Sequence, residues 1–349
     1  MSVQVKRLFK KLVSISGIVF FAIAAGMLYW QLSKFSLSDI FHIVFNIPLD
    51  HLLMAGALCL AGYVVLSFYD YLALRYLGRM VSWWRWMLGG MLGFAISNNA
   101  GTAVISGGSI RYRLYTRWRI KASEIVKMMT FIGITYFLGA SAVLVGGYFF
   151  IPQGLFDSSS VIGHGINVLM IFCATALTLC YGFSIFYRRT IRAFGLNFKM
   201  PHIKMALAQT ATGAMDSILA GLVLYSIISA FIEVPFGTFI AVFLVAQTTG
   251  IYSQVPGGLG VFESIMVAAL PAGTGNEATI FASLIAFRVI YYVMPLFLFG
   301  GLFFIYEHGL KLRMKRWADE ARALAHMVSH PHIHMPHPHM PHIRKKKPA

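Results

Sequence analysis

The sequence predicts an all-α, polytopic integral membrane protein. Hydrophobic residues make up 58% of the 349 residues, charged residues only 12%, and the mean hydropathy is +0.71. A soluble domain of this composition would lack the polar surface that keeps a protein in water. The length allows about eight apolar segments of ~20 residues with short connections, which leaves no room for a large soluble catalytic domain.

Apolar runs occur at about residues 14–30, 50–74, 86–110, 125–150, 161–187, 205–230, 235–271 and 276–306. We expect about six of them to cross the membrane fully, since each approaches the ~20 residues that a crossing needs. The other two, 86–110 and 235–271, are expected to be broken re-entrant hairpins, each entering and leaving by one face.

The distribution of positive charge supports this threading. With both termini in the cytoplasm, all but two of the 29 Lys and Arg residues lie on the cytoplasmic side, as the positive-inside rule requires. The exceptions are Lys34 and Arg288. A full crossing by 86–110 would export the arginine cluster that follows it. The net charge of +17 is therefore topological, and we expect no nucleic-acid partner.

Both re-entrant segments contain a glycine pair that predicts a helix break. The first contains Gly107 and Gly108, and the second contains Pro256, Gly257 and Gly258. Glycine is entropically costly inside a helix and proline lacks the N–H donor. In lipid, the backbone groups freed by a break are tolerated only beside protein or a water-filled cavity. The alternative is a kinked helix whose glycines only permit close packing.

The two segments lie at matching places in two candidate repeat units, about residues 50–150 and 205–306. Each unit begins with an apolar run that carries an acid, Asp70 in the first and Asp216 in the second. In the threading above the units have opposite orientations. Inverted repeats of this kind place substrate at their interface in transporters, near discontinuous helices.

Six ionisable residues are candidates for substrate binding and translocation: Asp70, Arg111, Arg113, Asp216, Glu263 and Arg288. A charge at the membrane centre costs ~2.5 to 3.5 kcal/mol on insertion scales, so each needs a partner or an aqueous cavity. Arginine suits phosphate and acids suit ammonium, so a cavity with both would fit a zwitterionic headgroup. The alternative is structural pairing, of Asp216 or Glu263 with Arg288 and of Asp70 with Arg75.

Aromatic residues interleave with the arginines after the first glycine pair. Tyr112, Tyr115 and Trp118 are about three residues apart. Rings and cations together are typical of the headgroup layer, where anionic lipid is the first partner we expect.

Three motifs in order, GGSIRYRLY, VPGGLGVFE and RVIYYVMP, resemble the membrane region of the lysylphosphatidylglycerol synthase/flippase family (MprF-like), and in particular its stand-alone YbhN-type members. The likeness covers about residues 10–310. It implies a flippase-like module that moves phospholipid, in some relatives aminoacylated phosphatidylglycerol, between leaflets of the bacterial cytoplasmic membrane. Asp70, Arg111, Asp216, Glu263 and Arg288 fall where that family has polar membrane residues.

The chain ends soon after residue 310, so we expect no cytosolic aminoacyl-transfer domain and no aminoacyl-lipid synthesis by this chain alone. No GxSxG, HExxH, phosphate-loop or Rossmann pattern occurs in a suitable context, and no cofactor is predicted. The alternatives to a flippase are a membrane-embedded lipid-modifying enzyme and an accessory partner of a phospholipid synthase. The family resemblance also suits a homodimer.

The region beyond residue 310 is expected to lie outside the membrane core. Residues 311–328 fit a basic amphipathic helix on the inner leaflet, and 329–349 a disordered, basic tail rich in His and Pro. No metal site is predicted. The nearest approach to one is the tail set His330, His332, His334, His337 and His339, whose spacing fixes no ligand geometry.

Overall fold

The computed structural model describes residues 37–99, 103–148, 161–186, 190–193, 196–253, 255, 258–270, 277–306 and 308. The chain divides into two units, Met1–Gly301 and Leu302–Ala349, and the packing described below belongs to the first. The predicted crossing at 14–30, the amphipathic segment 311–328 and the tail 329–349 lie outside the described residues.

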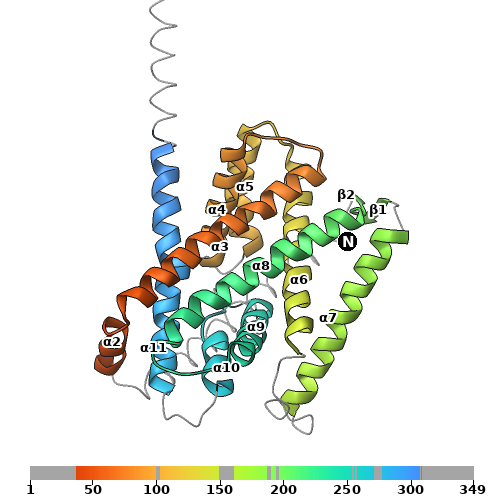
Figure 1. Cartoon of the computed structure of the whole chain (residues 1–349). Helices are drawn as coiled ribbons and strands as arrows, with labels where there is room; N and C mark the ends of the chain where they lie inside the picture. The colour runs from red at the N-terminus through yellow and green to blue at the C-terminus, as the bar shows by residue number, and fades with distance from the viewer. Residues whose placement is uncertain are drawn as a thin grey trace, which may run out of the picture. The chain divides into compact units, whose positions relative to one another are not determined.

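Helices dominate the described ranges (Figure 1). The first half contains α2 (Leu37–Phe45), α3 (Leu49–Tyr76), α4 (Trp83–Asn99), α5 (Ala103–Arg117) and α6 (Ala122–Tyr148). The second half contains α7 (Val161–Phe186), α8 (Ile203–Ile228), α9 (Phe236–Tyr252), α10 (Val261–Ala269), α11 (Glu277–Arg288) and the π-helical turn η3 (Val289–Val293). The last helix continues through 294–306.

Five helices are long and apolar enough to cross a membrane: Leu49–Tyr76, Ala122–Tyr148, Asn167–Phe186, Ile203–Ile228 and Glu277–Tyr306. They match the predicted full crossings that fall within the described residues, and the prediction of an all-α polytopic membrane protein is confirmed. One small addition is a β hairpin between α7 and α8, in which β1 (Thr190–Ala193) pairs antiparallel with β2 (Leu196–Lys199).

Helix α8 packs along both α3 and α6 and so forms the centre of the first unit (Figure 1). It meets α6 at Gly139 and Gly213, where a Cβ on either glycine would collide with the other helix's backbone. One turn earlier, Gln209 Nε2 donates to Thr135 Oγ1 at 2.9 Å. The two helices therefore run parallel and touch main chain to main chain, as small residues allow in membranes.

The relative directions of the other helices agree with the predicted threading. Helix α3 runs antiparallel to α8, because Tyr69 meets Asp216 while His51, near the other end of α3, meets the Ser226 carbonyl. Helix α3 runs parallel to the last helix, because Cys59 meets the Ile290 carbonyl while Tyr63, one turn later in α3, contacts Phe299, further along the last helix.

Helices α4 and α5 form the first hairpin (Figure 1). The start of α4 lies beside the end of α5: the Trp84 and Trp118 ring centroids are 6.0 Å apart, and the Arg85 guanidinium lies over both rings, at 5.3 and 5.8 Å. At 1.5 Å per residue α4 is about 25 Å long and α5 about 22 Å, each shorter than the ~30 Å hydrocarbon core. The hairpin therefore enters and leaves at one end of the helix bundle.

The predicted helix break at Gly107 and Gly108 is wrong. Both residues lie inside α5, which begins at Ala103, and α4 ends at Asn99. Gly107 serves packing: a Cβ there would collide with the Ser97 side chain of α4. Gly107 therefore fits the alternative stated in the sequence analysis, in which the glycine permits close contact between helices.

The same facing surface of α4 makes room for two large side chains of α5. A Cβ on Gly93 would lie 2.7 Å from Arg111 Cζ, and a Cβ on Gly89 would lie 2.5 Å from the Tyr115 hydroxyl oxygen. Gly89 and Gly93 are four residues apart, as are Arg111 and Tyr115, so each pair shares a helix face. The glycines let both side chains pass across α4.

Helices α9 and α10 form the second hairpin, with Phe243 and Phe262 in edge-to-face contact 5.7 Å apart. Near the turn, Gly250 and Gly258 approach so closely that a Cβ on Gly258 would lie 3.1 Å from Gly250 Cα. Gly258 has φ +63°, a left-handed conformation that favours glycine, and the helical path is interrupted here. Pro256 and Gly257 lie outside the described residues.

The end of α5 carries a non-glycine residue in the left-handed region. The Ile120 N–H donates to the Tyr115 carbonyl and the Arg119 N–H to the Thr116 carbonyl, which is the Schellman pattern. In this pattern the left-handed position is usually glycine, whereas here it is Arg119, with φ +64°.

We predict that Gly93→Ala destabilises the protein although alanine is the better helix former. Arg111 is pinned by its partners, so the new Cβ forces it off its position at a cost of about 1–3 kcal/mol. Gly108→Ala is the matched control, because a Cβ there would meet only Met129 Cε, at 3.7 Å. Thermal unfolding in detergent should show a lower melting temperature for the first variant only. Equal melting temperatures would contradict the packing argument.

We predict that Arg119→Gly raises the melting temperature in the same assay. Glycine removes the left-handed penalty of about 1–2 kcal/mol, part of which is offset by the greater freedom of glycine in the unfolded chain. Arg119→Ala serves as the control, since alanine removes the charge and keeps the penalty. A gain in both variants would assign the effect to charge rather than to backbone conformation.

Candidate functional site

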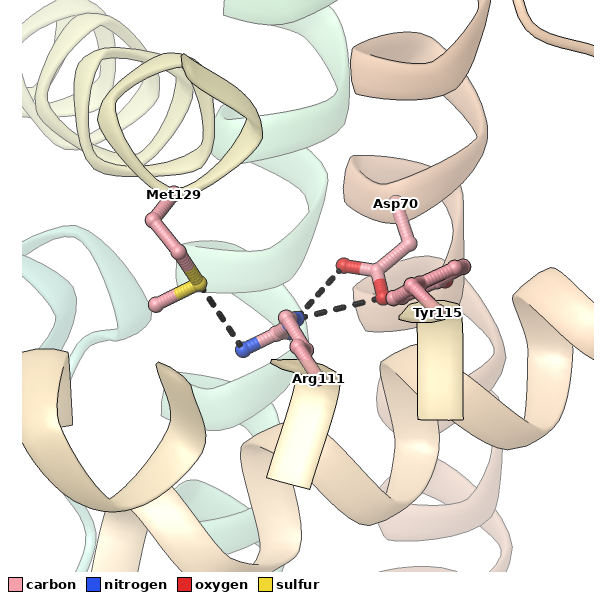
Figure 2. Close-up of polar contacts among 4 residues, drawn as sticks. All are labelled: Asp70, Arg111, Tyr115 and Met129. Atoms are coloured by element: carbon pink, nitrogen blue, oxygen red, sulfur yellow. Dashed lines mark hydrogen bonds and ion pairs between the residues drawn. The ribbon is translucent and has the colours of Figure 1, made fainter. Parts of the chain in front are cut away.

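The deepest charged cluster joins α3 to the first hairpin. Arg111 Nε donates to both carboxylate oxygens of Asp70, at 3.0 and 3.2 Å, and the Tyr115 hydroxyl donates to Asp70 Oδ2 at 2.8 Å. The Arg111 and Asp70 side chains are 1% and 0% exposed. Figure 2 shows Arg111 and Tyr115 reaching Asp70 from the same helix. One buried carboxylate is thus held by two residues one turn apart on α5.

The rest of the Arg111 guanidinium faces an aromatic ring and a thioether sulfur. Its Cζ lies 4.6 Å from the centroid of the Phe94 ring, and Nη1 approaches Met129 Sδ at 4.0 Å (Figure 2). Nη2 is buried and makes no hydrogen bond within the part of the chain that the structure describes. A buried polar group without a partner is costly, so this edge is suited to accept an oxygen ligand such as a phosphate.

A second ion pair joins the second hairpin to the last helix. Arg288 Nε donates to Glu263 Oε1 at 2.5 Å, and the Arg288 guanidinium lies over the Tyr292 and Phe262 rings, at 5.3 and 5.9 Å. Glu263 Oε2 accepts the Gly260 N–H at 2.8 Å, at the start of α10. A helix N-terminus favours a negative charge, so Glu263 is stabilised from two sides.

The third buried acid, Asp216 of α8, is held by tyrosines. The Tyr69 hydroxyl donates to Asp216 Oδ2 at 2.8 Å, and the Tyr291 hydroxyl is a second partner. Asp216 is 5% exposed and Tyr69 is fully buried. An arginine holds each of the other two acids, whereas the contacts described for Asp216 come from hydroxyl groups.

The clusters around Asp70 and Asp216 are linked through α3 and α4. Tyr69 and Asp70 are consecutive residues of α3, and each reaches a different cluster. The Phe94 ring of α4 contacts both the Tyr69 ring, at 5.2 Å between centroids, and the Arg111 guanidinium. Movement of the first hairpin would therefore disturb both acids.

The structure brings four of the six candidate residues into pairs, Asp70 with Arg111 and Glu263 with Arg288. The second pair is the structural pairing that the sequence left open. The alternative pairing of Asp70 with Arg75 is wrong, because Arg75 donates to the Tyr71 hydroxyl. Arg113 is exposed on α5, two residues from Arg111, and is not part of the buried cluster.

Sequence reasoning missed the aromatic partners of the acids. The sequence pattern places Tyr115 in the headgroup layer, whereas it is fully buried on Asp70. The pattern does not mark Tyr69, Tyr291 or Phe94 as partners. The available signal was the i, i+4 spacing of Arg111 and Tyr115, which places both on one face of a helix.

Basic residues from several segments collect at one end of the helix bundle. Arg79, after α3, forms an ion pair with Glu124 of α6 at 3.0 Å, and Arg85 lies between the Trp rings at the mouth of the first hairpin. The Tyr76 hydroxyl donates to the Lys199 carbonyl of β2 at 2.7 Å, which brings the β hairpin to the same end. Cations and indole rings together are typical of a headgroup layer.

Within the described ranges, no group of three or more His, Cys, Asp or Glu side chains is arranged as a metal site would require. The tail histidines, His330, His332, His334, His337 and His339, lie outside those ranges.

Comparison with known proteins identifies the family. The sequence profile described as "Lysylphosphatidylglycerol synthase TM region" matches residues 17–300. An uncharacterized protein of Synechocystis sp. is 32% identical over 318 residues, 87% of this chain and 95% of that protein. The inner membrane protein YbhN of Escherichia coli is 28% identical over 306 residues, 86% of this chain and 94% of YbhN.

A longer relative is matched over only part of its length. The phosphatidylglycerol lysyltransferase of Staphylococcus xylosus is 26% identical over 331 residues, which are 91% of this chain but 37% of that enzyme. The chain thus spans a little over a third of that enzyme's length. The helices that cross the membrane, the buried charges between them and the extent of these matches agree, and the chain belongs to the family of the lysylphosphatidylglycerol synthase transmembrane region.

Proposed function

We propose that this chain moves a phospholipid between the leaflets of the bacterial cytoplasmic membrane. The substrate would be an aminoacylated phosphatidylglycerol or another anionic or zwitterionic lipid. The observation that carries the proposal is the buried Asp70–Arg111 pair between α3 and the first hairpin. Ionisable residues inside a membrane are expensive, and in transporters they mark substrate and ion pathways.

The chemistry of the three acids and two arginines fits a lipid headgroup. Arg111 has a guanidinium edge, Nη2, to offer to a phosphate, and arginine binds phosphate in a planar, two-point geometry. Asp216, held only by hydroxyls among the contacts named above, suits the ammonium of an amine-bearing headgroup. The Asp70–Arg111 pair is closed in this structure, so substrate entry requires the first hairpin to move from α3.

The contacts also support the proposal of an inverted repeat. Helix α3 packs on α4 as α8 packs on α9, and each hairpin pairs its own two helices. Across the units, α4 packs on η3 of the last helix while α9 packs on α6. This exchange is what two repeats of opposite orientation would produce, and such repeats place substrate at their interface.

We further propose that the basic end of the bundle faces the cytoplasm. It carries Arg79, Arg85 and the exposed cations that follow α5, in keeping with the positive-inside rule. Anionic lipids of the inner leaflet would bind there, attracted by about 1 kcal/mol per basic residue near the surface.

We predict that the purified full chain in proteoliposomes moves a fluorescently labelled aminoacyl-phosphatidylglycerol between leaflets without changing its chemical identity. Dithionite quenching reports the leaflet, and mass spectrometry of the extracted lipid reports identity. A new lipid species would instead indicate a lipid-modifying enzyme. Neither movement nor a new species would indicate an accessory role, and both outcomes would overturn the proposal.

We predict that the double variant Asp70→Asn with Arg111→Gln lowers this movement at least about tenfold, since a lost charged contact costs about 1.5–3 kcal/mol. The double change avoids the buried, unpaired charge that either single change would leave, which would itself destabilise the fold. Arg113→Ala is the control, because Arg113 is exposed on the same helix. Wild-type movement in a correctly folded double variant would remove the pair from the pathway.

A further inference from the structure

The last helix contains a π-helical turn, η3, directly before a proline. The Met294 N–H donates to the Val289 carbonyl, five residues back, which is the π spacing. Position 295 is a buried proline inside the continuing helix. Because proline has no N–H, it cannot donate to the Ile290 carbonyl at π spacing or to the Tyr291 carbonyl at α spacing.

Side chains from other helices donate to the carbonyls of this turn. Cys59 Sγ donates to the Ile290 carbonyl at 3.3 Å, and the Tyr63 hydroxyl donates to the Tyr291 carbonyl at 3.2 Å. Both donors come from α3. Buried carbonyls need partners, so these bonds replace what the proline withholds.

The third carbonyl of the turn is bonded from the first hairpin. Asn99 is the last residue of α4, and its Nδ2 donates to the Tyr292 carbonyl at 2.9 Å while also donating to Ala95, one turn back in its own helix, at 2.8 Å. A single amide thus ties the inner end of the first hairpin to the π-helical turn.

The π-helical conformation of this turn sets the direction of side chains that contact two of the three buried acids. Arg288, immediately before it, meets Glu263, and Tyr291, within it, meets Asp216. Tyr292 lies beneath the Arg288 guanidinium. A π-helical turn contains one more residue than the α-helical turn it replaces. Reversion to an α-helix would therefore rotate one side of the helix relative to the other by about 100°.

We infer that Asn99 is a positioning residue: its bond to the Tyr292 carbonyl holds η3 in the register that aims Arg288 at Glu263 and Tyr291 at Asp216. This role rests on the proposed function, because it makes Asn99 a link between the first hairpin and the charged groups around Glu263 and Asp216. When the first hairpin moves, Asn99 leaves the turn or carries it along.

The test uses the full chain with Asn99→Leu, which keeps the branched shape of the side chain and removes the donor. We expect hydrogen–deuterium exchange of the amides at 289–294 to increase, and lipid movement in proteoliposomes to fall by about tenfold, the effect of one buried hydrogen bond. Gln209→Met is the matched control, because it removes a buried amide bond to Thr135 at the α6–α8 contact. It should leave exchange at 289–294 unchanged.

Pro295→Ala tests the same turn by restoring the missing N–H donor. This second variant keeps the inference testable if Asn99→Leu does not fold. Alanine restores an N–H that competes for the Ile290 and Tyr291 carbonyls, so we again expect altered exchange at 289–294 and reduced movement. Unchanged exchange at 289–294 in both variants would overturn the inference, as would altered exchange with wild-type movement. A wild-type chain that moves no lipid would overturn the proposed function alone, since exchange still reports on the positioning.

Discussion

The cost of placing charge in lipid is the constraint on which the arrangement of this protein depends. Asp70 and Arg111 are fully buried, and removing water from such groups costs several kcal/mol each unless they find partners. Arg111 sits on a helix of its own hairpin and can reach Asp70 only across α4. The glycines of α4 are therefore a condition for the pair, and the pair fixes how closely the first hairpin lies against α3.

The second proposed repeat, residues 205–306, meets the same constraint with different residues. Glu263 is held by Arg288 and by the N-terminus of α10, and Asp216 is held by hydroxyl groups from α3 and the last helix. Each acid thus draws partners from elements far apart in sequence. Because Tyr69 and Asp70 are neighbours on α3, the clusters around Asp216 and Asp70 share one supporting helix.

The crossing helices were predictable because lipid demands long apolar runs, and five of them appear where hydropathy placed them. The helical conformation of Gly107 was not predictable, because glycine occurs both at helix breaks and at close helix contacts, and only the contact with Ser97 of α4 distinguishes the two. The acids and arginines could be identified because charge inside an apolar segment costs free energy. Their pairing could not be predicted, because the sequence does not show whether Arg75 or Arg111 lies beside Asp70. The π-helical turn depends on donors from α3 and α4, which only the tertiary structure brings near Pro295.

The contact between Gly139 and Gly213 has a mechanical consequence. Helices whose long side chains interdigitate must separate before they can rotate against each other. At the Gly139–Gly213 contact no side chains interdigitate, so rotation there needs no such separation. Helix α6 ends the first proposed repeat and α8 begins the second, so a relative rotation of the two proposed repeats would pivot at this contact. Rocking about it would displace residues near the crossing least and the far ends of both helices most.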